Sequence, residues 1–537
     1  MDDRSTGLPL GNSDVASAGI SRRHALFGGA ALIAGAVLLD GCTHSSGTSP
    51  SATAKASGKP VRGGSLRVGV IGQGTLEDLA PSITGPPAIV RGEQLYDRLF
   101  DLASDLKSLT PKLALSAEPN ADATVWTFKL RDGVTWHDGK TLTAEDVVYT
   151  IKGWGDKDSL TFGSLNSLID YKNVRSSGKL TVIVPLLKPS AQFPTLSAVN
   201  ASYSVRQSGS SLKTLARRPI GTGPFSYKSF TPGAQSTFVA NRDYWQHGGP
   251  YIDELIVNSS FTDPTAMVNA LEGGQLDVAT LLPPLAGKQA AAGAFTLLRA
   301  PSPNATFFYM DITSAPFKDV RVRQALKLVA DRQALIDGAL AGFGTPGNDL
   351  FGAGSEYFDS TLKSVRDVDK AKSLLRSAGQ SGLTVSLSTS KAFPGAEEAA
   401  TLFAQQAKEA GVNIRLDVKS AASYYDSSAG FPWHFGQDYS SPQASLAAWY
   451  RLFFIEYNET RWDVPGDSAL QAAFVEIDKS KAAEKWAIAQ KEQFDNGGAI
   501  VWGNSDLLDG LAKRVRGIPP SPVNCSNNYR YVDAWVV

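Results

Sequence analysis

The most regular pattern of apolar and polar positions lies in residues 124–151. Its first half alternates apolar and polar residues with a period of two, which predicts a half-buried strand ending in a turn at residues 131–133. Thr143 then predicts the N-cap of a helix, because Glu145 and Asp146 stand in the first turn, where the helix dipole favours negative charge. We therefore expect a strand, a turn, a short second strand and a helix, a scaffold without chemistry of its own.

Similar patterns recur along the rest of the chain. The segments that predict strands are 63–70, 180–187, 307–311, 383–387 and 412–418. Two helices are predicted to begin at Asp319 and at Asp369, and a third is predicted at 399–411. Because strands and helices alternate in the second half, we expect a largely parallel sheet with crossover helices there.

Length and charge narrow the class of protein. A chain of 537 residues exceeds what one hydrophobic core usually holds, so two or more lobes are expected. Lys+Arg and Asp+Glu both total 52, which gives a formal net charge of zero. This balance argues against a nucleic-acid partner, because phosphate binding needs a basic surface.

The N-terminus has the features of an export signal. Residues 21–26 (SRRHAL) resemble a twin-arginine signal, and the apolar run 25–39 is too short for a membrane span but suits a signal peptide. Residues 39–42 (LDGC) resemble a lipobox, which implies that Cys42 is lipidated and becomes the mature N-terminus. Asp40 departs from the small residue usual at its position. The alternative is an uncleaved anchor helix.

A polar linker and a single remaining thiol follow from the composition. Residues 43–61 are rich in Ser, Thr, Gly, Ala and Pro, so we expect a flexible tether. The chain has two cysteines, and lipidation of Cys42 would leave Cys525 alone. This excludes an intramolecular disulfide and a cysteine-based metal or dithiol site in the mature chain, and we expect Cys525 to be buried.

Few sequence motifs suggest catalysis. The chain has no H-E-x-x-H and no G-x-S-x-G, and the S-x-x-K at residues 104–107 is not followed by S-D-N or K-T-G. Residues 221–223 (GTG) do not predict a phosphate loop, because Pro224 lacks the amide that phosphate would need. We expect His137 to face solvent. The sequence therefore predicts no enzyme, no cofactor and no metal site.

Residues 130–140 (LRDGVTWHDGK) and 143–147 (TAEDV) resemble the signature of the family 5 extracellular solute-binding proteins, the peptide-binding components of ABC importers. Blocks at 219–225, 241–245 and 316–326 are similar to the same family. The resemblance covers essentially the whole mature chain. It implies the type II periplasmic-binding fold, in which two α/β lobes close over a ligand as a flytrap does.

The resemblance also implies a domain layout. After an export signal at 1–42 and the tether at 43–61, it places the first lobe at 62–298, an extra subdomain within it at about 89–199, the second lobe at 299–497 and a returning segment of the first lobe at 498–537. The expected crossings between lobes lie near Ala300 and near Gly497-Gly498, which are the hinge candidates.

Aromatic residues are concentrated in one region. Ten of the 32 residues from 431 to 462 are aromatic, where the average of 9% predicts about three. They are Phe431, Trp433, Phe435, Tyr439, Trp449, Tyr450, Phe453, Phe454, Tyr457 and Trp462. Residues 431–442 have no clean period and predict a loop, and aromatic loops between lobes commonly hold ligands. The alternative is a core cluster under a long loop.

Residues 437–442 (QDYSSP) resemble the family's D-Y-x-x-P segment, whose aspartate pairs with the α-ammonium group of a peptide. The resemblance assigns that role to Asp438, in an aromatic segment that contains Trp433 and Tyr439. It places Phe435 where relatives carry a tryptophan that packs on the ligand. The alternative for Asp438 is an Asx-turn that stabilises its own loop.

Two further positions match the family more loosely. Asn458 corresponds to a family asparagine, and Gly85 lies in a segment, 84–87, where relatives pair their backbone with the ligand. Pro86 lacks an amide donor for such pairing.

Together these features predict an exported, lipid-anchored receptor on the outer face of the plasma membrane. It would capture short peptides and deliver them to the transmembrane permease subunits of an ABC importer, without a nucleic-acid partner. Two alternatives remain open. The same scaffold could bind a non-peptide ligand such as haem, glutathione or a sugar, or the chain could be a cell-surface hydrolase.

Overall fold

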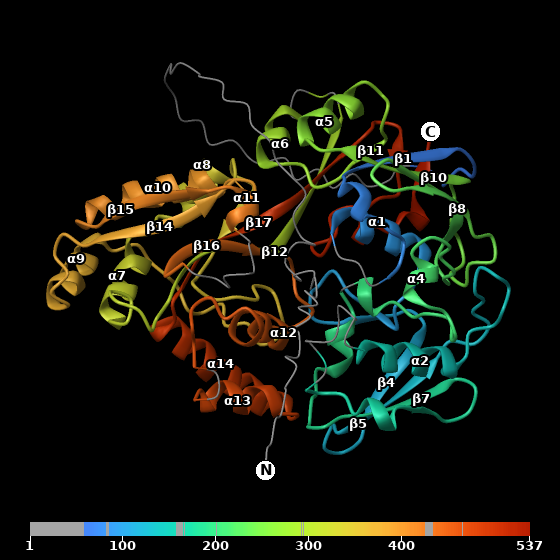
Figure 1. Ribbon diagram of the computed structural model, residues 1–537, viewed down its shortest axis with the longest axis horizontal. Coiled ribbons are helices and arrows are strands. Elements are labelled where there is room, and N and C mark those ends of the chain that lie inside the picture. Colours follow the sequence, from blue (N-terminus) through green and yellow to red (C-terminus); the bar gives the residue numbers. More distant parts are fainter. Residues whose placement is uncertain are drawn as a thin grey trace, which may run out of the picture.

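The computed structural model describes residues 58–81, 85–156, 165, 167–199, 201–290, 293, 295–391, 393–424, 433–463 and 466–537. The export signal, Cys42, most of the predicted tether and Phe431 lie outside these residues. Figure 1 shows an α/β molecule of two lobes joined by long crossing strands. This is the predicted two-lobed architecture.

The first lobe is built around five strands. They are β1 (Ser65–Ile71), β8 (Phe225–Thr231), β9 (Gln235–Ala240), β10 (Glu254–Phe261) and β11 (Val278–Ala279). Its helices are α1 (Pro86–Leu95), α4 (Leu212–Leu215), α5 (Pro264–Glu272) and α6 (Pro284–Ala290). The chain end adds β18 (Val515–Arg516) and β19 (Trp535–Val536).

A subdomain with its own core extends from the first lobe. It contains β2 (Phe100–Leu102), β3 (Leu109–Pro111), β4 (Ala114–Pro119), β5 (Val125–Leu130), α2 (Ala144–Trp154), β6 (Arg175–Ser176) and β7 (Thr181–Pro185). Strands β4, β5, β7 and β6 form one antiparallel sheet. In Figure 1 it lies at the lower right, below α1.

The second lobe follows in the chain. Its strands are β13 (Gly344–Pro346), β14 (Thr384–Ser390), β15 (Asn413–Lys419) and β16 (Phe435–Ser440). Its helices are α7 (Val320–Val329), α8 (Arg332–Ala339), α9 (Val368–Ser377), α10 (Ala396–Glu409), α11 (Ala421–Tyr424), α12 (Leu446–Arg451), a π-helix (Leu452–Glu456), α13 (Ser468–Val475) and α14 (Lys479–Asn496).

Two long antiparallel strands, β12 (Thr296–Met310) and β17 (Ala499–Leu511), run through both lobes. They belong to a nine-stranded sheet of order β16-β12-β17-β11-β1-β10-β9-β8, with β13 added on β17. The predicted parallel sheet of the second half is correct for β14–β15 and wrong for β12, β13, β16 and β17, whose pairings are antiparallel. The reason is that β12 and β17 cross between the lobes in opposite directions.

Both faces of β12 are buried in the second lobe. Phe308 and Met310 pack into a core with α7, α8 and α10, whereas Phe307 and Tyr309 pack into another core with α12, α13 and α14. A strand covered by helices on both faces reads as a continuous apolar run rather than an alternating one. The crossing strands therefore form a rigid centre for the lobe.

Local predictions from the signature segment are largely confirmed. Trp126, Phe128 and Leu130 are buried on one face of β5. The amide of Thr143 donates to the Asp146 carboxylate at 2.8 Å in the capping box that opens α2. The short second strand is reduced to a single bridge between Thr135 and Thr141.

Two single residues test the predictions in opposite ways. Cys525 is fully buried and unoxidised, as predicted. His137 is half-buried, so the prediction that it faces solvent is wrong. Its Nδ1 accepts the amide of Gly221, and its Nε2 bonds the carbonyl of Gly223 at 3.0 Å. Burial lowers the pKa of His137, which favours the neutral ring. The two hydrogen bonds fix this ring against the distant segment 221–223.

The segment predicted as an aromatic loop contains a strand instead. Residues 435–440 form β16, which pairs antiparallel with β12 from Met310 to Ala305. The sequence shows no alternation of apolar and polar residues here, because a buried position is occupied by the polar residue Gln437. Its side chain donates to the carbonyl of Ala396 at 2.8 Å. Of the predicted loop at 431–442, residues 431 and 432 lie outside the described residues.

The pairing of β12 with β17 is interrupted between Ala300 and Asn304, and the strand partners shift there. Pro301 and Pro303 occupy this interruption, since proline cannot donate a ladder hydrogen bond. On β17 the same irregularity falls between Ser505 and Leu507, several residues beyond the predicted crossing at Gly497-Gly498. The residue limits of the lobes stay predictions.

Candidate functional site

Asp438 lies in the middle of β16, opposite Phe307 of β12. It is 7% exposed, and its Oδ1 accepts the amide of Tyr439 at 2.8 Å. Burial raises the pKa of Tyr439 above its ordinary value, and the nearby Asp438 carboxylate raises it further. The same carboxylate contributes to the raised pKa of Tyr424. The site therefore places a carboxylate among phenol groups in a largely desolvated position.

Aromatic rings also lie close to β16, although Tyr439 points to the face of the strand opposite Asp438, because side chains alternate along a strand. The rings of Tyr439 and Phe393 are 4.9 Å apart, and Trp433 stacks on Tyr424 at 6.0 Å. The Nζ of Lys419 lies 5.1 Å from the centre of the Trp433 ring. The hydroxyl of Tyr424 donates to the carbonyl of Gln437, the residue before Asp438, at 2.6 Å. Tyr424 thus connects the strand bearing Asp438 with Trp433.

Phe435 does not lie with these residues. Its ring is 2% exposed and packs in the core between α7 and α10, 5.2 Å from Phe317 and 6.4 Å from Phe403. The strand geometry explains this, because alternate residues of β16 point to opposite faces. The structure gives Phe435 a packing position, and its predicted contact with ligand has no support from this geometry.

Asn458 serves the turn that follows the π-helix. It has a φ of +42°, and its side chain bonds Trp462 twice, through Oδ1 to the amide at 2.8 Å and through Nδ2 to the carbonyl at 2.9 Å. Asparagine favours such left-handed positions because its side chain can bond the local backbone. Both ends of the Asn458 amide are therefore already engaged within this turn.

Gly85 lies in the first lobe, as the N-cap of α1, with a φ of +113° that only glycine adopts readily. Pro86 and Pro87 form the first turn of this helix. In Figure 1, α1 and β16 lie on opposite sides of the crossing strands. Gly85 thus lies in the first lobe, whereas the other predicted site residues lie in the second lobe: Trp433, Phe435, Asp438, Tyr439 and Asn458.

The model of the bacterial extracellular solute-binding proteins, family 5, matches residues 108–453. The chain belongs to this family. It is 26% identical to a dipeptide-binding protein of Pseudomonas aeruginosa over 485 residues, which cover 83% of this chain and 90% of that one. It is 29% identical to heme-binding protein A of Haemophilus influenzae over 333 residues, 56% of this chain and 60% of that relative.

The fold agrees with the sequence family. The crystal structure of CtaP, an ABC transporter substrate-binding protein from Listeria monocytogenes, superposes with a TM-score of 0.78 at 22% identity, covering 88% of this chain and 99% of that one. The chain therefore has the type II periplasmic-binding fold of this solute-binding family. Among the residues described, no helix is both long and apolar enough to cross a membrane.

One contact of this family 5 protein was not foreseen from the sequence. Arg451, at the end of α12, donates to the hydroxyl of Ser167 in the subdomain of the first lobe at 3.2 Å. Nearby, a Cβ on Gly354 would lie 3.2 Å from Leu106, also of the subdomain. The two lobes therefore touch on this side. No local signal could have shown this, because 284 residues separate Arg451 from Ser167.

The other aromatic residues of the concentrated region are mostly core. Trp449, Tyr450, Phe453 and Phe454 are buried under α12, α13 and α14. Tyr457 and Trp462 are partly buried against the same cluster. The alternative interpretation, a core cluster, is thus confirmed for the four buried rings of this solute-binding protein.

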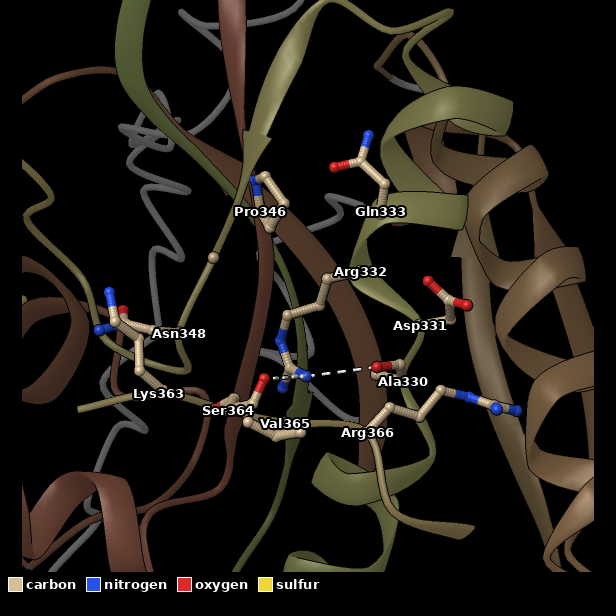
Figure 2. A pocket seen from close by; sticks show the side chains of 11 residues that line it. Ala330, Asp331, Arg332, Gln333, Pro346, Asn348, Lys363, Ser364, Val365 and Arg366 are labelled. Carbon is tan, nitrogen blue, oxygen red and sulfur yellow. Dashed lines mark hydrogen bonds between the residues drawn. The ribbon is translucent and has the colours of Figure 1, made fainter. Parts of the chain in front are cut away.

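A pocket of about 500 Å³ lies in the second lobe, between the start of α8 and the segment that follows β13 (Figure 2). Arg332 reaches across it, bonding the carbonyl groups of Ala330 and Ser364, and pairs with the buried carboxylate of Asp349 at 2.7 Å. None of the predicted site residues lines it. The guanidinium of Arg332, which crosses the pocket, is thus already paired with a carboxylate of the protein.

Proposed function

We propose that this family 5 protein is the ligand receptor of an ABC importer and that it captures short peptides between its lobes. The observation that carries the proposal is Asp438, a buried carboxylate on the strand next to β12, which lies close enough to the phenols of Tyr439 and Tyr424 to raise their pKa values. A carboxylate in such surroundings suits an α-ammonium group, because a charge-assisted hydrogen bond is strong where water is excluded.

The chemistry of the site supports a ligand with a cationic end and an otherwise variable body. Trp433 and Tyr439 offer ring faces that contact many side chains without selecting one. Bridging water can fill the remaining space for different side chains. A dipeptide-binding protein is among the relatives, which supports the same ligand class.

A non-peptide ligand is the second candidate. The observation that favours it is the relative named heme-binding protein A, because the scaffold itself does not fix the ligand. Haem would need ring surfaces and an iron ligand or propionate partners rather than an amine-binding carboxylate. The two candidates therefore differ in whether Asp438 contacts a cationic group.

We further propose that the protein is exported and held at the outer face of the plasma membrane by lipid on Cys42, where it delivers ligand to transmembrane permease subunits. It acts by binding and does not catalyse a reaction. The lipobox-like residues 39–42 and the family support this proposal.

Native mass spectrometry of the purified full chain tests the ligand class directly. A co-purified peptide, or a retained peptide from a defined mixture of di- to pentapeptides, supports the proposal. Retention of haem or another non-peptide, with no peptide retained at millimolar concentration, would overturn it in favour of the second candidate.

A further inference from the structure

Phe343 belongs to the second lobe by its chain position but packs on the first. It follows α8 directly, and its amide donates to the carbonyl of Leu340, which is buried in the second-lobe core. Its ring instead packs against the first-lobe cluster formed by α5, α6 and the adjoining strands. A Cβ placed on Gly287 of α6 would lie 2.7 Å from this ring. The two lobes are therefore in direct contact at Phe343.

Charged groups of both crossing strands hold the ring in place. The guanidinium of Arg299, on β12, lies 5.3 Å from the centre of the Phe343 ring and pairs with Asp506 of β17. The amide of Asp506 donates to the carbonyl of Phe343 at 3.2 Å. The Asp506 side chain is 1% exposed, so Arg299 supplies the charge that its burial requires.

This cluster stands where the lobes can rotate. Arg299 lies one residue before Ala300, the last paired residue ahead of the interruption of the β12–β17 ladder, which contains Pro301 and Pro303. A bend at this point would change the separation of Phe343 from Gly287 of α6, because the two residues lie on different lobes. The contact between Phe343 and Gly287 is present in the same structure as the contact between Arg451 and Ser167.

We propose that Phe343 is a positioning residue: its contact with Gly287 exists in the closed form and sets ligand affinity without touching the ligand. The inference rests on the proposed function only in that the lobes close over a bound solute. Glycine at position 287 is then required by closure, because any larger residue would meet the Phe343 ring.

The substitution Gly287→Ala separates closure from folding. Alanine favours a helix over glycine, so the ligand-free protein should melt at the same or a higher temperature. The added methyl would press on the Phe343 ring when the lobes close. Overpacking of this kind should weaken peptide binding by about fivefold to a hundredfold. Phe343→Leu in the Gly287→Ala background should recover most of that loss.

Gly338→Ala is the matched control. Gly338 is also a helical glycine, and its added Cβ would lie 2.4 Å from Leu402, but both residues belong to the second lobe. This substitution should change thermal stability without changing affinity. Equal loss of affinity in the two alanine variants would show that the effect is general and would overturn the inference.

A ligand-independent measurement keeps the inference separate from the proposed function. Ser167→Cys and Arg451→Cys, in a Cys42→Ala background, allow a short bismaleimide to link the lobes when they are closed; Cys525 is buried. Gly287→Ala should slow this cross-linking, and Phe343→Leu should restore it. An unchanged rate would overturn the inference, whereas failure of the wild type to bind any peptide would count against the proposed function alone.

Discussion

Arg451 of the second lobe donates a hydrogen bond to Ser167 of the first-lobe subdomain, at 3.2 Å. Burial lowers the pKa of Arg451, whereas its hydrogen bond to Ser167 is itself exposed to solvent. A hydrogen bond that joins the lobes stabilises only arrangements in which the two lobes are in contact at this point. Its free energy therefore adds to the apparent affinity for any ligand that the lobes enclose.

We expect Ser167→Ala to weaken ligand binding by about twofold to tenfold, the range given by the loss of one ordinary hydrogen bond. The melting temperature of the ligand-free protein should hardly change. Calorimetry of ligand binding and thermal unfolding measure the two effects. Glu409→Ala is the control, because it removes an ion pair with Arg366 that lies wholly within the second lobe. Equal affinity of wild type and Ser167→Ala would contradict the closing role.

Asp438→Ala should cost about 3–5 kcal/mol of peptide affinity, because it would leave the ligand's ammonium group buried and unpaired. That is roughly a hundredfold to several thousandfold in Kd. N-acetylation of the peptide removes the same charge and should weaken binding to the wild type by a similar factor. It should add little to the loss in Asp438→Ala.

Calorimetry on the four combinations of protein and peptide gives the coupling. If Asp438 only stabilises its own strand through the amide of Tyr439, the variant should instead melt at a lower temperature and treat both peptides alike. Additive penalties would remove Asp438 from the site. Thr389→Ala is a useful control, because it disturbs the opposite face of β16 through Gln437.

Cys42→Ala should abolish membrane association of the mature protein. The lipobox-like segment 39–42 motivates this prediction, and several acyl chains on one cysteine would anchor the protein firmly, whereas one chain binds reversibly. Fractionation of cells with and without an inhibitor of lipoprotein signal peptidase measures it. Unchanged processing and partitioning in both experiments would show that Cys42 is not a lipid attachment site.

The elements that the sequence predicted well depend on neighbours in the chain. The capping box of Thr143 and Asp146 and the N-cap of Asp319 each satisfy backbone amides within three residues. Such signals need no knowledge of the fold. The family resemblance then supplied the two-lobed arrangement, which local patterns could only suggest through the length of the chain.

The errors arose where distant segments decide the environment of a residue. The side chain of Gln437 is buried because Thr389 and Ala396 satisfy it, and both lie more than 40 residues away. His137 is turned inward by backbone groups of Gly221 and Gly223. The contact between Phe343 and Gly287 depends on how two lobes meet. No period or motif in the sequence encodes these placements.

Asp509 predicts how stability depends on pH. Its carboxyl group is fully buried on β17, where it accepts the amide of Leu281 at 2.7 Å and the amide of Ser526 at 3.1 Å. Burial raises the pKa of Asp509 from 3.8 to about 6, although these bonds lower it. Between pH 4 and 6 the folded state therefore holds a proton that the unfolded state has lost.

The contribution of Asp509 to the free energy of unfolding should accordingly fall as the pH rises from about 4 to 6 and stay reduced above that. Asp509→Asn removes the buried charge, which should make the protein about 1–3 kcal/mol more stable at pH 7. The altered hydrogen bonds with Ser526 should make this gain smaller. Denaturant unfolding of both proteins from pH 4 to pH 8 measures this.

Asp277→Asn is the contrasting control. Its carboxylate pairs with Arg67 and Arg514, so the same change should destabilise the fold at pH 7. Parallel stability curves for wild type and Asp509→Asn would show that Asp509 does not retain its proton in the folded state.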